Sequence, residues 1–370
     1  MIRLSSIIET FETPFIARYG QRLQPVQRKA LEAMKRCRTA MAPKMQVECR
    51  DCDEQHFVPH SCGHRNCPHC QHHESQQWLE RQLKKQLPGE YFLLTFTLPA
   101  ELRPLARSHP STIYNQMTAC CWQTVSTFSQ NDKQLQGTPG AIAVLHTHSR
   151  RLDYHPHVHL VMPAGAINTK HRLWRTKNRK KDGSAYLFNH KALAKVFRAK
   201  LLAAIAEAGI SLPKRHPQQW VVDCKAVGSG EKALVYLGRY LYRGVLQEKD
   251  IIDCADGLVT FRYKNSKTGE MEKRTLDGAD FLWLLLQHVL PKGFRRARNF
   301  GFLHPNSKRM IQLLHYLLGV SVQRSLGLMR KRPALLCRCC GKPMTVVRTQ
   351  IAASLNSNSP PDTKQYALMI

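Results

Sequence analysis

Histidines alternate with other residues in the segment that reads His-Pro-His-Val-His from position 155. Successive side chains of a β-strand point to opposite faces, so His155, His157 and His159 would share one face, and Val158 and Leu160 the other. A lone histidine on a strand is usually structural, whereas two or three on one face favour metal binding. The segment therefore predicts a metal site with His157 and His159 as ligands.

A second pair of histidines, His146 and His148, lies in the preceding apolar segment. If the two segments form a hairpin, one of this pair lies beside His157 and His159, and we favour His146 as the third ligand. Imidazole suits transition metals such as Mn²⁺, while a site that cuts phosphodiesters can also recruit Mg²⁺ through substrate oxygens. Such a site leaves coordination positions free for a phosphate oxygen, where the ion would act as a Lewis acid.

Two tyrosines, Tyr236 and Tyr240, are four residues apart in a segment with helical periodicity. Residues at this spacing lie one turn apart on the same face of a helix, so both phenols could enter one cleft. Aromatic pairs at this spacing also pack in helical cores, and the pair alone does not decide between the two roles. Together with the histidines, it predicts nucleophiles that attack phosphorus once a metal or nearby cations favour the phenolate.

Three cations, Arg239, Arg243 and Lys225, are close enough in sequence to favour the phenolate and to contact DNA. Attack by a tyrosine would leave a phosphotyrosine and a free 3′ hydroxyl, and the reverse reaction would join such a hydroxyl to another strand. Two tyrosines would permit two such events. Tyr242 is two residues from Tyr240 and would face elsewhere on a helix, so we interpret it as a packing residue.

Four cysteines in two Cys-x-x-Cys pairs, Cys49 with Cys52 and Cys67 with Cys70, are separated by 14 residues. This spacing is typical of two knuckles that deliver four thiolates to one Zn²⁺. We expect a structural zinc site, because four protein ligands leave no position for water. Residues of the same stretch that could replace one of these ligands are Cys62 and His64, and a second ion is a further alternative.

A third Cys-x-x-Cys pair, Cys337 with Cys340, has no second pair after it to complete a site. It could recruit Cys37 or be a simple turn. Further cysteines in apolar or mixed surroundings, which we interpret as core residues, are Cys120, Cys121, Cys224 and Cys254.

The composition points to a polyanionic partner. The chain has 370 residues and a formal charge of +30, from 56 Lys and Arg against 26 Asp and Glu. This charge exceeds what solubility needs, and it favours a nucleic-acid enzyme over a basic protein that merely meets RNA. No segment is typical of a secretory signal or a membrane span, so we expect a cytoplasmic protein without membrane partners.

Periodicity and turn signals predict the helices and strands that must position these residues. The predicted helices and strands alternate along the chain and would form one mixed sheet with its helices. Predicted strands cover Tyr91–Leu98, Ala141–Ser149, His155–Met162, Trp220–Ala226 and Leu258–Tyr263. Predicted helices cover Pro25–Met41, Pro110–Ser129, His190–Glu207, Glu231–Arg243 and Ala279–Val289. The basic stretch Lys170–Lys181 is interpreted as an exposed arm, and Ala353–Lys364 as disordered.

The order and spacing of these motifs resemble those of the two-tyrosine HUH transposases of the insertion-sequence 91 family, over most of the chain. Five stretches carry the resemblance: the cysteine stretch Cys49 to Cys70, the strand Leu94 to Pro99, His146 with His155 to His159, Tyr236 to Tyr240, and Leu290 to Leu303 with Arg298.

This resemblance implies that His157 and His159 bind the catalytic metal and that Tyr236 and Tyr240 are alternating nucleophiles. It also implies that the substrate is single-stranded DNA at the ends of the chain's own element, moved by a rolling-circle mechanism through a 5′-phosphotyrosine and rejoined to target DNA. Arg298 would contact DNA, and the protein would be bacterial and nucleoid-associated. The stretch Gly228 to Lys232 lacks the spacing of a phosphate-binding loop, so strand unwinding would come from a host helicase or replication proteins.

The expected fold class is α/β (α+β), with an HUH-endonuclease-like, mostly antiparallel central sheet flanked by helices. We divide the chain into an N-terminal helical and zinc-binding module at residues 1–88, with zinc ligands within 49–70, and a catalytic domain at 89–305. A C-terminal helical region with a cysteine-rich turn follows at 306–352, and then a tail at 353–370. Other functions compatible with the sequence are a rolling-circle replication initiator, a relaxase and a non-catalytic zinc-dependent DNA-binding regulator.

Overall fold

A computed structural model describes residues 2–68, 70, 72–178, 182–242, 245–265, 268–320 and 334–351, with the backbone alone at 72, 73, 239, 240 and 242. Its helices are α1 Leu4–Tyr19, α2 Pro25–Arg36, α3 His72–Leu83, α4 Arg103–Ser108, α5 Pro110–Asn131, α6 His190–Glu207, α7 Glu231–Tyr242, α8 Gly278–Leu286 and α9 Lys308–Leu317. Its strands are β1 Lys44–Cys49, β2 Gln55–Pro59, β3 Tyr91–Thr97, β4 Thr138–His148, β5 Tyr154–Pro163, β6 Gly165–Asn168, β7 Leu173–Thr176, β8 Val222–Ala226, β9 Ile251–Ala255, β10 Leu258–Lys264, β11 Met271–Asp277, β12 Ala297–Gly301 and β13 Met344–Ile351.

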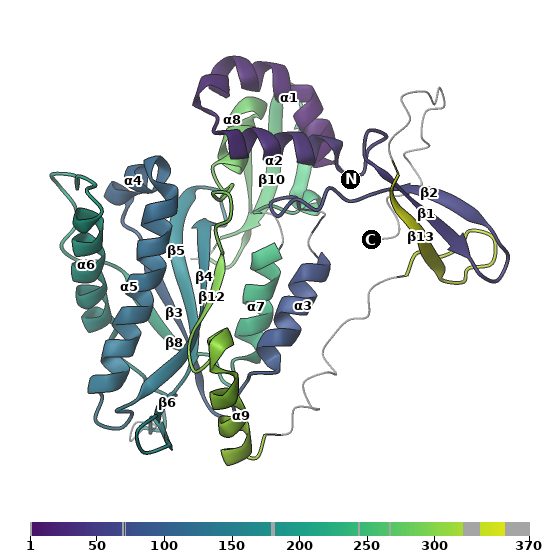
Figure 1. Ribbon diagram of the computed structural model, residues 1–370. Coiled ribbons are helices and arrows are strands. Elements are labelled where there is room, and N and C mark those ends of the chain that lie inside the picture. The colour runs from purple at the N-terminus through teal and green to yellow at the C-terminus, as the bar shows by residue number, and fades with distance from the viewer. Residues whose placement is uncertain are drawn as a thin grey trace.

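The central sheet has seven strands in the order β7-β6-β4-β5-β3-β8, with β12 paired to β4. Its strand pairs are antiparallel. Helices cover both faces, with α4, α5 and α6 on one side and α3, α7 and α9 on the other (Figure 1). The fold is therefore mixed α/β with an antiparallel central sheet flanked by helices, as the sequence predicted.

The hairpin of β4 and β5 separates two hydrophobic cores. Val158 and Leu160 on β5 point into the core beneath α5 and α6. Val161, with Val144 of β4, points into the core shared with α7. This alternation has the phase that the His-Pro-His-Val-His segment predicted, so the histidines at 157 and 159 face α7 rather than α5.

The N-terminal helices form a separate core with a segment from much later in the chain. Helices α1 and α2 pack against α8 and the three-stranded sheet β11-β10-β9. The prediction of one mixed sheet containing residues 258–263 is wrong, because β10 pairs with β9 and β11 instead of with the central sheet. Residues on both sides of the expected boundary at 88 thus share one core.

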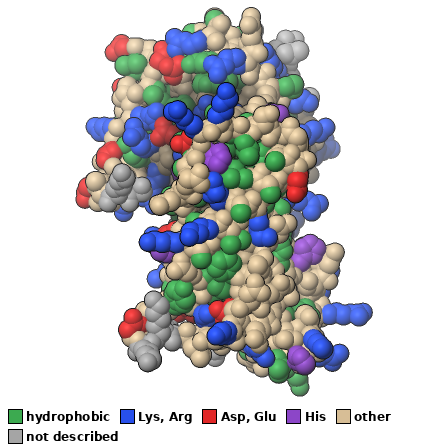
Figure 2. Space-filling model, turned by 90° about the vertical axis from the view of Figure 1, so that its left-hand side faces the viewer, with side chains coloured by type: hydrophobic (Ala, Val, Ile, Leu, Met, Phe, Trp, Pro, Cys, Tyr) green, Lys and Arg blue, Asp and Glu red, His purple; other side chains and the backbone are tan. Residues whose placement is uncertain are grey.

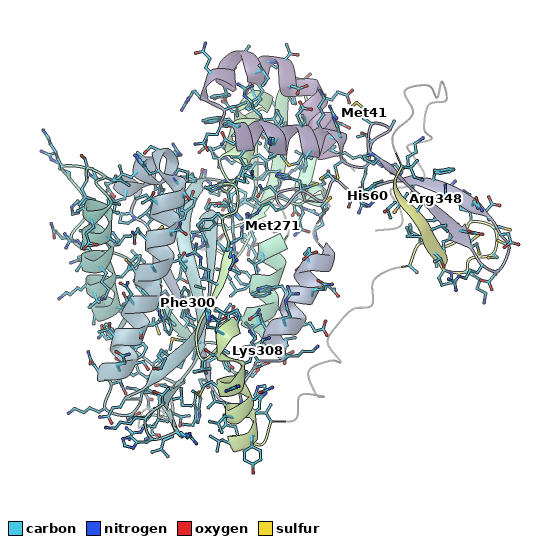
Figure 3. All side chains as sticks on the ribbon, in the orientation of Figure 1. Met41, His60, Met271, Phe300, Lys308 and Arg348 are labelled. Atoms are coloured by element: carbon cyan, nitrogen blue, oxygen red, sulfur yellow. The ribbon has the colours of Figure 1, made fainter. Side chains whose placement is uncertain are left out.

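A third sheet joins the last strand of the described residues to the first two strands of the chain. Strand β13 pairs antiparallel with β1, which also pairs with β2. This three-stranded ribbon stands apart from the central sheet and its helices, and Arg348 and His60 mark its place in Figure 3. The C-terminal region that was expected to be helical contains α9 and then this strand.

Part of the basic stretch expected as an exposed arm is strand β7, on which Trp174 is half-buried. Its ring contacts Phe302 with the centroids 5.5 Å apart. Residues 179–181 of that stretch and all of Ala353–Lys364 lie outside the described residues. Lys and Arg side chains are spread over the face drawn in Figure 2, with fewer acidic ones among them.

Candidate active site and metal sites

Three histidines meet on the face of the central sheet that α7 covers. The hairpin places His146 of β4 directly opposite His157 of β5, and His159 follows two residues later on the same face. Their ring nitrogens that could bind a metal lie within 4.8 Å of one another. The structure thus brings together the two histidines expected as ligands and the one preferred as the third.

Hydrogen bonds orient two of these rings. The His157 Nδ1 atom lies 2.7 Å from the carbonyl oxygen of His155, to which its N–H can donate. The His159 Nδ1 atom lies 3.0 Å from the Thr95 hydroxyl on β3. When Nδ1 carries the proton, the lone pair of Nε2 is free for a metal. His155 itself binds Arg103 through Nδ1, at 2.7 Å, and is not part of the three-histidine group.

Burial keeps these rings neutral. It lowers the pKa of His157 to about 4 and that of His159 to about 3, and it lowers the pKa of His146 well below its usual value. Burial also lowers the pKa of His148, whose ring packs 5.4 Å from that of His288. Neutral imidazoles are the form that binds metals.

Tyr236 on α7 lies above the histidines. Its ring centroid is 6.1 Å from that of His159 and 6.5 Å from that of His146. Leu237 is fully buried on the same helix, and the Ser75 hydroxyl of α3 donates to the carbonyl oxygen of Gly238 at 2.7 Å. Helix α7 is therefore held so that Tyr236 faces the cluster. The side chain of Tyr240, the other expected nucleophile, lies outside the described residues.

The expected cations have different surroundings. Lys225 is exposed on β8, and its Nζ lies 2.8 Å from a carboxylate oxygen of Asp223. Arg298 bonds to the side chain of Asn115, and its guanidinium lies 5.2 Å above the ring centre of Phe294. Arg243 and the side chain of Arg239 lie outside the described residues.

Two residues that contact this region could not be recognised from sequence motifs. Thr95 lies opposite His159 in the β3–β5 register, which cannot be known before the pairing of these strands. Arg296 donates to the carbonyl oxygen of Leu241 at 3.1 Å and lies 3.5 Å from the side-chain oxygen of Asn66. It thus connects the end of α7 to the cysteine-rich loop. The one signal in the sequence for such a role is its position two residues before Arg298.

The predicted set of four cysteines, Cys49, Cys52, Cys67 and Cys70, does not form one group. The structure divides it between two clusters, in each of which the sulfur atoms lie within 4.8 Å of one another. Cys49 and Cys52 lie at the end of β1 and in the turn after it, whereas Cys67 and Cys70 lie in the loop before α3. Closeness in sequence therefore does not bring the two pairs into one cluster.

The first cluster adds Cys37 and Cys62 to the pair Cys67 and Cys70. The Sγ atoms of Cys37 and Cys70 are 3.6 Å apart, and those of Cys62 and Cys70 are 3.5 Å apart. Cys62, which was predicted as an alternate ligand, is thus a member of the cluster, whereas His64, the other predicted alternate, is not. Its Nδ1 instead accepts from the backbone N–H of Asn66.

The second cluster joins Cys49 and Cys52 to Cys337 and Cys340. Cys37, which was a possible partner for the C-terminal pair, belongs to the first cluster instead. Backbone N–H groups of Cys340 and Cys339 lower the pKa of the Cys337 thiol to about 7. The cysteines of both clusters form no disulfide with one another or with other described cysteines.

Comparison with known proteins gives two family matches and close relatives. The family described as "Putative transposase" matches residues 140–310, and the family described as "Transposase zinc-binding domain" matches residues 7–98. The protein "Putative transposase y4qJ" of Sinorhizobium fredii is 30% identical over 81% of this chain and 80% of its own length. The chain belongs to the insertion-sequence 91 family of transposases.

A second relative of this transposase is the transposase for insertion sequence element IS801 of Pseudomonas savastanoi pv. phaseolicola, 26% identical over 76% of this chain and 71% of its own length. Among solved structures, the conjugative relaxase TrwC in its metal-bound complex with oriT DNA is similar with 15% identity and a TM-score of 0.27. The similarity covers 63% of this chain and 73% of the relaxase. Among the described helices of the transposase, none is both long and apolar enough to cross a membrane.

Proposed function

We propose that this transposase nicks single-stranded DNA at the ends of its insertion sequence and rejoins it to target DNA, with Tyr236 and Tyr240 as nucleophiles. The observation that supports this proposal is the Tyr236 ring within 6.5 Å of two of the three convergent imidazoles. A non-catalytic DNA-binding regulator would not need a phenol that faces three metal-binding histidines with coordination positions left for a substrate.

The histidine cluster fits a divalent ion. Three neutral imidazoles supply three nitrogen donors from a rigid hairpin, and the hydrogen bonds at His157 and His159 favour Nε2 as the ligand atom. Nitrogen donors suit Mn²⁺, and phosphate oxygens of bound DNA would complete the shell for Mg²⁺. The ion would supply Lewis acidity at a phosphate oxygen, which eases attack on phosphorus.

In the proposed step, the hydroxyl oxygen of Tyr236 forms a bond to phosphorus, and the bond from phosphorus to the 3′ oxygen breaks. The phenol loses its proton and the leaving 3′ oxygen gains one, so the charges balance. A 5′-phosphotyrosine and a free 3′ hydroxyl result. Attack by another 3′ hydroxyl on the phosphotyrosine reverses the reaction and joins two strands, and Tyr240 provides for a second such event.

Cations outside the histidine cluster would bind the DNA backbone. Arg298, Lys225, Arg239 and Arg243 are the residues that we propose for this role, and the formal charge of +30 supports a polyanionic partner. For unwinding, we propose that a host helicase or replication protein acts with the transposase.

The first cysteine cluster would hold a structural zinc ion. Its four members all lie within residues 7–98, the range that matches a transposase zinc-binding domain. The sulfur separations of 3.5 and 3.6 Å are close to the ~3.8 Å that tetrahedral bonds of ~2.3 Å would give. Four protein ligands close the site, so we propose a role in folding rather than in hydrolysis.

The decisive experiment looks for a covalent adduct that survives denaturation, after the transposase has met labelled single-stranded DNA from an element end with Mn²⁺. We expect Tyr236→Phe/Tyr240→Phe to abolish the adduct and Tyr236→Phe alone to lower its rate at least about 10³-fold, as removal of a nucleophile does. His157→Ala/His159→Ala should also lose it. Tyr316→Phe, at a phenol exposed on α9, is the matched control and should keep it. An undiminished adduct in the double tyrosine variant would refute the nucleophiles.

A further inference from the structure

The three-stranded ribbon β13-β1-β2 has almost no hydrophobic core. Along its strands, the buried side chains are Val47 and Cys49, both on β1. Val346 and Val347 of β13 are exposed by 46% and 50%. A sheet this small that buries so little needs another source of stability, which in small domains is commonly a metal or a disulfide.

Two turns of the ribbon have the same backbone geometry. In the first, the N–H of Cys49 donates to the carbonyl oxygen of Glu54 at 2.9 Å, and the N–H of Asp53 donates to that of Cys49 at 3.0 Å. In the second, the N–H of Cys337 donates to the carbonyl oxygen of Lys342 at 2.8 Å, and the N–H of Gly341 donates to that of Cys337 at 2.9 Å.

The two turns also match at the residue that follows the second cysteine. Asp53 and Gly341 each follow the second cysteine of their pair, and both have a left-handed backbone, with φ of 57° and 70°. Each turn thus folds a Cys-x-x-Cys pair into the same knuckle, with both thiols on one side. Two such knuckles that face each other are the arrangement that surrounds one tetrahedral ion.

The sulfur atoms of the two knuckles meet across the ribbon. Cys49 lies 3.4 Å from Cys340, and Cys52 lies 3.5 Å from Cys337 and 3.6 Å from Cys340. These separations are too long for a disulfide, which needs about 2.0 Å, and close to the ~3.8 Å expected around tetrahedral Zn²⁺. The residues that meet here are up to 291 positions apart in the sequence.

We propose that Cys49, Cys52, Cys337 and Cys340 bind a second Zn²⁺, separate from the zinc of the first cluster. On binding, the four thiols lose their protons and form four Zn–S bonds, with no redox change. This ion fastens β13 to β1, so that the last described strand stays on the N-terminal ribbon. The match to a zinc-binding domain ends at residue 98 and contains only half of this site.

The test measures zinc in the purified full-length transposase by mass spectrometry, after dialysis against a weak chelator that empties the three-histidine site. We expect about two zinc ions per chain, about one in Cys337→Ser/Cys340→Ser, and about one in Cys37→Ser/Cys62→Ser. Cys339→Ser is the matched control, since this exposed cysteine lies in the same knuckle without joining the cluster, and it should keep two.

Hydrogen exchange supplies a second readout that separates local release from failure to fold. In Cys337→Ser/Cys340→Ser, amides of β13 and β1 should lose protection, while those of β3 and β5 keep it. Equal zinc contents in wild type and Cys337→Ser/Cys340→Ser would overturn the proposal, and so would unchanged protection of β13. The adduct assay is independent of both readouts, so failure of the proposed nuclease would leave this result standing.

Discussion

At the scale of single residues, the histidine cluster depends on groups that are not ligands themselves. The His155 carbonyl and the Thr95 hydroxyl fix which nitrogen of His157 and of His159 faces the metal position. Partners of this kind set the tautomer and direction of a ligand, and their loss commonly weakens metal binding about 10- to 100-fold. Thr95 is the one of the two that mutation can remove cleanly.

We therefore predict that Thr95→Val lowers the affinity for Mn²⁺ about 10-fold, because the His159 ring loses the partner of its Nδ1 atom. The measurement is the Mn²⁺ concentration that gives half of the maximal adduct. At saturating Mn²⁺ the adduct should recover. Thr97→Val removes a hydroxyl from the same strand two residues away and should leave the half-maximal concentration within about twofold of wild type. A Thr95→Val enzyme with normal Mn²⁺ dependence would show that the hydroxyl does not position the ring.

The sequence alone predicted the members of the histidine cluster better than those of the cysteine clusters. The convergence of His157 and His159 follows from period-two alternation within one strand, and the hairpin adds His146 through a connection of a few residues. The same reasoning gave the wrong partners for the cysteines, because Cys49 and Cys52 meet cysteines 291 and 285 positions away and not the pair that follows 14 residues later. Spacing rules describe local knuckles and contain no information on which knuckles face each other.

At the scale of elements, the same limit explains the sheets. Most of the predicted helices and strands are present close to their expected bounds, for example α6 at His190–Glu207. Periodicity within a segment determines such an element. Strand β10 was also recognised, but its assignment to the central sheet was wrong, since pairing depends on the tertiary core that α1, α2 and α8 form.

Strand β12 pairs closely with β4, which is one strand of the histidine hairpin. Gly301, at its end, has a φ of +60°, and a Cβ there would lie 1.8 Å from the carbonyl oxygen of Pro139 in β4. We predict that Gly301→Ala destabilises the fold by at least about 2 kcal/mol more than the backbone strain alone, because β12 must move off β4. Urea unfolding followed by circular dichroism measures this.

The matched control is Gly319→Ala, at a φ of +61° with no described atom within 4 Å of the added Cβ. It carries the same backbone strain, about 1–2 kcal/mol, without the clash. Equal losses of stability in the two variants would mean that the approach of β12 to β4 is unimportant.

At the scale of the whole molecule, the net positive charge should dominate binding to DNA. For about six phosphate contacts to a single strand, the logarithm of the affinity falls with that of the salt concentration with a slope of about −4. We predict that binding weakens about 300-fold between 50 and 200 mM KCl, as measured by fluorescence anisotropy with a labelled single strand. A slope near zero would exclude the charge of +30 as the source of affinity.

The pairing of β1 with β13 also orders events during synthesis. Residues 44–49 leave the ribosome early, but their partner strand ends at residue 351, so the ribbon stays incomplete until nearly all of the described chain has been translated. A transposase gene interrupted upstream of codon 337 could still encode the histidine hairpin and α7, yet its product would lack one whole knuckle. Completion of the ribbon therefore distinguishes a product translated through residue 351 from the product of a copy of the element that is interrupted upstream of codon 337.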